Sequence, residues 1–194
     1  MCVTFNSRTM FLATMLVLVS AVGASVNSTS GAGASRMAWM KSLLDHHSWV
    51  EYLNNGSLAL PLKCETDLRT YLTGLNDGQL WASKIFDASG HYTSNVLFGN
   101  EYWLGSQDAC RDLQLTEYYA HTPPFPTAFY VAKINLTVDN DHLPQSRLML
   151  VGECVPASCD KGAITSLLGA AEGAATAQAS AAGLSASFST LNVR

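Results

Sequence analysis

The sequence has few charged residues, and its lysines and arginines do not cluster. Charged residues make up 13% of the 194 residues, with 11 Lys and Arg against 15 Asp and Glu. A net charge of −4 without a basic patch argues against nucleic-acid binding, because phosphate recognition needs such a patch. After residue 30 the chain also lacks a run of roughly 20 apolar residues, so no membrane-spanning helix is expected there. The length fits one domain with tails.

The first 24 residues have the order that is typical of a secretory signal peptide. A single cation, Arg8, precedes an apolar run from Met10 to Val19, and small residues follow up to Ala24. This pattern predicts cleavage before Ser25, and the run is short for the alternative, an uncleaved membrane anchor. We therefore expect a secreted protein, or one on the extracellular or lumenal face of a membrane. Residues 25–35 are small and polar and predict a flexible leader.

Removal of the signal peptide would take away Cys2 and leave an even number of cysteines. They are Cys64, Cys110, Cys154 and Cys159. An even number in a secreted chain predicts two disulfides, and no metal is expected because a second close Cys or His pair is missing. We favour Cys64–Cys159, which would join two helix starts, together with Cys110–Cys154. The main rival is a direct Cys154–Cys159 bond, since Pro156 could form the necessary turn.

Three N-glycosylation sequons fit the same compartment. They begin at Asn27, Asn55 and Asn135. Apolar residues alternate from Tyr130 to Val138, which predicts a strand with Asn135 on its wetter face. The sequence therefore predicts an extracellular or lumenal glycoprotein.

The remaining patterns predict an α+β fold: a small disulfide-braced domain over 36–170, mostly helical, with a short antiparallel hairpin. Apolar spacing predicts helices over 36–53, after Cys64, and up to Phe86, with Leu68, Trp81 and Phe86 in the core. A turn should follow at 87–90, with Gly90 at positive φ, and a packed loop over 93–115. A second strand is expected over 147–151, and a helix capped by Asp160. Residues 171–194, rich in Ala, Gly and Ser, predict a linker or disordered tail.

Two motifs together carry a family resemblance. The first reads W-A-S-K-I-F-D-A-S-G at 81–90, and the second reads C-V-P-A-S-C at 154–159. With Cys64 and Asp108-Ala109-Cys110, the chain from about residue 40 to 170 resembles the N-terminal domain of nose resistant to fluoxetine proteins. One departure is Val131, where the family often has a cysteine.

The resemblance implies an extracellular domain that usually precedes a many-helix acyltransferase-3 membrane domain. Proteins of this family are implicated in moving lipids and drug-like molecules across epithelia. Any acyltransferase activity would belong to that membrane domain, which this chain lacks. The resemblance therefore implies a non-catalytic module that binds a lipid or a small apolar ligand, with the membrane domain as a further partner. The alternatives are a ligand-free assembly ectodomain that docks on the membrane domain and, third, an acyl-transfer enzyme.

No catalytic or metal-binding constellation stands out among the candidate side chains. The chain has five histidines but no G-x-S-x-G motif, so neither catalysis nor a cofactor is expected. In Asp45-His46-His47, adjacent helical side chains would point about 100° apart and converge poorly on one metal ion. Trp81 and Asp87 are candidates for lining a ligand site, although core packing of Trp81 and turn closure by Asp87 are the favoured interpretations.

Overall fold

A four-stranded sheet with a long central hairpin organises the described part of the chain. The structure is a computed structural model, and it describes residues 38–56, 58–92, 99–115, 121–138 and 146–194. Strands β2 (Thr127–Val138) and β3 (Ser146–Pro156) pair antiparallel, from Thr127 opposite Pro156 to Thr137 opposite Ser146. The predicted strand over 130–138 is confirmed, and the second strand is longer than predicted.

Two further strands complete the sheet in the order β1-β3-β2-β4. The short β1 (Tyr102–Trp103) runs parallel to β3, and β4 (Ala186–Val193) runs antiparallel to β2. The sheet is therefore mixed, while the α+β class and the antiparallel hairpin agree with the sequence.

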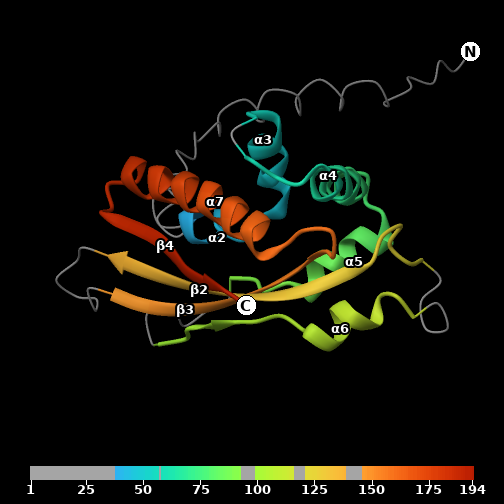
Figure 1. The fold of residues 1–194 in the computed structure, drawn as a ribbon. Helices are drawn as coiled ribbons and strands as arrows, with labels where there is room; N and C mark the ends of the chain where they lie inside the picture. Colours follow the sequence, from blue (N-terminus) through green and yellow to red (C-terminus); the bar gives the residue numbers. More distant parts are fainter. Residues whose placement is uncertain (1–37, 57, 93–98, 116–120, 139–145) are drawn as a thin grey trace, which may run out of the picture. The chain divides into compact units, whose positions relative to one another are not determined.

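Helices cover one face of this sheet (Figure 1). They are α7 (Lys161–Ala181), α2 (Ala38–Ser42), the 3-10 turn η1 (His46–Ser48), α3 (Trp49–Asn54) and α4 (Leu62–Asn76). Asp160 caps α7 as predicted, because its Oδ1 accepts a hydrogen bond from Ala163 N at 2.8 Å. α5 (Leu80–Ala88) follows α4, and α6 (Gln107–Asp112) lies against the other sheet face near the start of β2 (Figure 1).

The prediction of a linker or disordered tail over 171–194 is wrong. Residues 171–181 are the second half of α7, where Ala171, Ala175 and Ala179 are buried at a spacing of four. β4 then pairs with β2 and buries Phe188 against Trp39, with ring centroids 5.3 Å apart. Alanine has the highest helix propensity and leaves room for close packing, so this composition builds a helix here instead of a linker.

Three local predictions also need correction. Residues 36–53 do not form one helix, because the described part breaks between α2 and η1 at Asp45, whose side chain caps η1. The loop predicted over 93–115 contains β1 and α6. Gly90 is not among the glycines with positive φ. It is needed for close approach instead, since a Cβ there would lie 1.7 Å from the Trp103 carbonyl oxygen.

Two disulfides brace this arrangement. Cys64 at the start of α4 bonds Cys159 just before α7, and Cys110 of α6 bonds Cys154 of β3. This is the pairing favoured from the sequence, and the direct Cys154–Cys159 bond is not formed.

Candidate functional site

Among the residues that the structure describes, no helix covers part of one sheet face. Along β2, Ala132, Ile134 and Leu136 are buried on the helical side, whereas Val131 and Lys133 belong to the opposite face. On that opposite face α6 packs only near the start of β2, where Cys110 reaches Cys154. The middle and far end of the hairpin therefore present an open surface.

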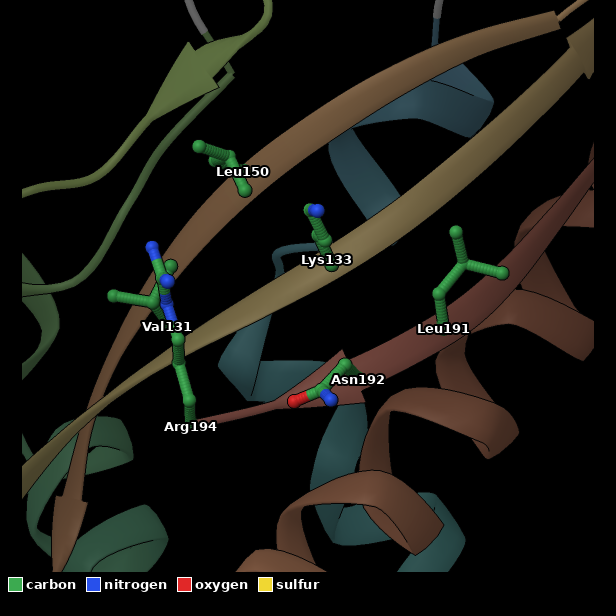
Figure 2. Close-up of a pocket in the computed structure, with 6 residues that line it drawn as sticks. All are labelled: Val131, Lys133, Leu150, Leu191, Asn192 and Arg194. Carbon is green, nitrogen blue, oxygen red and sulfur yellow. The ribbon is translucent and has the colours of Figure 1, made fainter.

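A groove of about 340 Å³ crosses this open surface. We call it the sheet-face groove, and it is lined by Val131, Lys133, Leu150, Leu191, Asn192 and Arg194 (Figure 2). These residues come from three adjacent strands, since Lys133 lies opposite both Leu150 of β3 and Asn192 of β4. Arg194 is held in place by two backbone hydrogen bonds with Val131, at 2.9 and 3.1 Å.

The lining combines apolar side chains with two cations. Leu191 is 59% exposed, and the neighbouring Leu148 and Tyr102 are 38% and 64% exposed. Tyr102 extends the apolar surface because it pairs with Leu150 and so shares its face. Among the residues that the structure describes, no carboxylate side chain lines the groove, and neither Lys133 nor Arg194 forms an ion pair.

A second polar cluster is completely buried on the helical side of the sheet. His46 of η1 lies 2.7 Å through Nε2 from Glu153 Oε2 of β3, and 2.7 Å through Nδ1 from the Tyr71 hydroxyl of α4. None of these three side chains is exposed to solvent. Trp49 stacks on the His46 ring with centroids 4.0 Å apart, and Phe86 meets its edge at 5.4 Å.

The proton arrangement in this cluster follows from Tyr71. Burial, and after it the charge of Glu153, raises the pKa of Tyr71 well above its usual value, so the phenol keeps its proton. The hydroxyl can then donate to Nδ1, which leaves Nε2–H of His46 to donate to Glu153. Because solvent does not reach these groups, the cluster positions η1 and α4 on β3 and is not open to a substrate.

Asp67 forms a third polar link beside the Cys64–Cys159 disulfide. Its Oδ1 accepts from Lys63 Nζ and its Oδ2 accepts from Ser158 Oγ, both at 2.7 Å. Burial favours the neutral acid, but the hydrogen bonds from Lys63 and Ser158, with the charge of Lys63, outweigh it and lower the pKa of Asp67. Through its hydrogen bond from Ser158, the Asp67 carboxylate therefore links α4 to the segment that precedes α7.

The residues predicted to line a ligand site lie elsewhere. Trp81 on α5 is half-buried and meets Phe125 edge to face at 5.8 Å, and Asp87 on the same helix is exposed. Neither lines the sheet-face groove. Of the predicted core residues, Leu68 is fully buried, while Trp81 and Phe86 pack against the core with part of their surface exposed.

The glycosylation candidates differ in position. Asn55 is exposed in the turn after α3, and Asn135 lies on the open sheet face, where its side chain contacts Thr137 and Ser146. Asn27, the signal peptide over 1–24 and the leader over 25–35 lie outside the described residues.

Asp45, His46 and His47 do not converge. His46 points to Glu153, whereas His47 is half-exposed and its Nδ1 lies 3.0 Å from Asp45 Oδ1. Within the described ranges, no group of three or more His, Cys, Asp or Glu side chains could hold a metal ion.

In the same part of the chain, no helix is long and apolar enough to cross a membrane.

Sequence reasoning missed both the groove and the buried cluster. A continuous helix over 36–53 would place His47 on the apolar side, but the break at Asp45 turns His46 inward instead. Glu153 is the one charged residue in the buried stretch of β3 between Val151 and Val155. A charged residue within an apolar stretch of this kind could have identified Glu153 as part of a buried polar cluster.

Comparison with known proteins gives one match. The family model described as nose resistant-to-fluoxetine protein, N-terminal domain, matches residues 64–168, which is more than half of the chain. No curated protein and no solved structure matches.

Proposed function

Because this chain belongs to the family of nose resistant-to-fluoxetine N-terminal domains, we propose that it is a non-catalytic extracellular module that binds a lipid or a small apolar ligand in the sheet-face groove. It would serve lipid or xenobiotic transport by membrane proteins of the acyltransferase-3 type. Secretion after removal of residues 1–24, with N-glycans on the sequons, is part of the same proposal.

The sheet-face groove is the observation that carries this proposal. Its volume of about 340 Å³ lies in the range of small-molecule sites, which runs from roughly 300 to 1,000 Å³. Exposed apolar residues that gather on one face commonly mark a binding surface. The buried His46 cluster supports a non-catalytic role, because its acid, imidazole and phenol are closed to solvent.

Binding of oleyl alcohol, a neutral long-chain probe, tests the proposal. Equilibrium dialysis of the glycosylated protein secreted from insect cells against tritiated oleyl alcohol should show saturable binding. Leu150→Ser and Leu191→Ser should weaken it, because each removes apolar surface from the groove. Leu62→Ser is the matched control, since Leu62 is 80% exposed on α4, away from the groove.

The outcomes separate the candidate roles. Equal binding by all three variants would contradict the groove as the site. Absence of binding, together with capture of an acyltransferase-3 membrane domain, would favour the alternative of an assembly ectodomain. Enzymatic removal of glycans should leave the affinity unchanged or raise it, because Asn135 lies on the same face two residues beyond Lys133.

A further inference from the structure

We infer that the sheet-face groove selects a long-chain carboxylate, with the acyl chain on its leucines and the anionic head between Lys133 and Arg194. This inference rests on the proposed function, and it names the chemical class of the ligand.

The sheet holds the backbone positions of the two cationic residues close to each other. Val131 and Lys133 are two residues apart on one face of β2, a spacing of roughly 7 Å along a strand. The reciprocal backbone hydrogen bonds hold Arg194 directly beside Val131. Figure 2 shows the guanidinium group of Arg194 beside the Val131 side chain and the Lys133 side chain on the same face. One head group can therefore lie between the two positive charges.

The charges of the lining side chains favour an anion. The chain has a net charge of −4, yet the described side chains that line the groove include two cations and no acid. Ion pairs with described residues do not neutralise either cation. A carboxylate or similar anion would complement this local charge, and the effect should weaken with salt.

The apolar part of the groove adjoins the cations. Leu150 lies directly opposite Lys133 across the β2–β3 ladder, and Leu191 lines the same groove from β4. A volume near 340 Å³ is small for a site of this kind, which favours one acyl chain over the two chains of a phospholipid.

The test compares two ligands that differ only in the head group, oleate and oleyl alcohol, by equilibrium dialysis below their aggregation limits at pH 7.4. The unmodified protein should bind oleate more tightly than oleyl alcohol, and 0.5 M NaCl should reduce the difference. Lys133→Glu should weaken oleate binding about 3- to 10-fold, and it should weaken oleyl alcohol binding by a smaller factor. Lys133→Gln should give an intermediate loss, and Lys161→Glu, the same charge change on α7, should give none. Circular dichroism melting of each variant confirms that it is folded.

The results distinguish this inference from the proposed function. If both ligands bind equally and Lys133→Glu changes neither, the inference is overturned while the proposed function stands. If neither ligand binds, the proposed function fails as well. Tighter binding to dioleoyl phosphatidylserine vesicles than to oleate would overturn the choice of a single-chain carboxylate. Sedimentation that shows a dimer with the groove closed to oleate would assign this face to a second copy of the chain.

Discussion

The two disulfides should contribute almost equally to stability, although their loops differ about twofold in length. Cys64–Cys159 closes a loop of 95 residues and Cys110–Cys154 closes one of 44. In the chain-entropy model, separate loops of these lengths would stabilise the fold by about 4.7 and about 4.0 kcal/mol. The shorter loop is nested inside the longer one, however. While Cys110–Cys154 is intact, it shortens the outer loop to about 51 residues, and the outer bond is then worth about 4.1 kcal/mol.

The assay is guanidinium unfolding monitored by tryptophan fluorescence. We compare the protein with the double variants Cys64→Ala/Cys159→Ala and Cys110→Ala/Cys154→Ala. All four cysteines are at most 1% exposed, so the cost of truncating the side chains is matched between the two pairs. The Cys64→Ala/Cys159→Ala variant should lose about 4.1 kcal/mol of unfolding free energy. The Cys110→Ala/Cys154→Ala variant should lose about 3.4 kcal/mol, because without the inner bond the outer bond closes its full loop and is worth about 4.7 kcal/mol.

Two results would refute this reasoning. A loss below about 1 kcal/mol for either pair would mean that its bond hardly restricts the unfolded chain. A much larger loss for the outer pair would mean that nesting does not shorten its loop. Equal m-values across the variants are the control that their unfolded states are comparable. Since a domain of this size is stable by about 5–15 kcal/mol, loss of both bonds should leave it largely unfolded.

Three single substitutions test the polar links and a close backbone contact. Tyr71→Phe should cost about 1–3 kcal/mol at pH 7, because it leaves Nδ1 of His46 without its partner. The raised pKa of Tyr71 predicts that the native protein loses stability as the pH rises above about 10. Urea unfolding between pH 8 and 11 should show this loss, and Tyr71→Phe should lack it. The lowered pKa of Asp67 means that its carboxylate stabilises the fold above about pH 4 and that this contribution is lost as the pH falls further. Asp67→Asn should therefore reduce the dependence of the unfolding free energy on pH between pH 5 and 2. An unchanged dependence would contradict this expectation. Gly152→Ala should lower the unfolding free energy by about 1–3 kcal/mol or more, because the new Cβ would lie 2.0 Å from the Leu104 carbonyl oxygen. The control Gly169→Ala, which has open space around it on α7, should be neutral or stabilising. Equal effects of the two substitutions on the melting temperature would contradict the close contact at Gly152.

The sequence predicts the elements whose side chains follow a clear period. β2 shows strict alternation, α4 has leucines at helical spacing, and α7 begins at a capping aspartate. Each of these signals is local, so neighbouring residues suffice to recognise it. For the disulfides, the sequence predicts two bonds and favours the observed pairing on topology, but it leaves the rival Cys154–Cys159 bond open.

Other features depend on contacts that no local pattern encodes. In the second half of α7 the buried stripe consists of alanines, which look like linker composition until β4 and α2 supply a surface to pack against. The sheet-face groove needs the register of three strands, and Arg194 reaches it only because β4 pairs with β2. His46 becomes a core residue only through Tyr71 and Glu153, which are 25 and 107 residues away.

The position of β4 beside β2 has a practical consequence for anyone who shortens this protein. The family match ends at residue 168, within α7, so a chain cut there would lose residues 169–181 of that helix and the whole of β4. Seven residue pairs along β2, from Ala132 to Val138, would then lose their partner strand. An uncapped strand of this length, with Ile134 and Leu136 newly uncovered, invites pairing between molecules. Protein that ends at residue 168 should therefore precipitate, while protein that retains residues 169–194 should remain monodisperse.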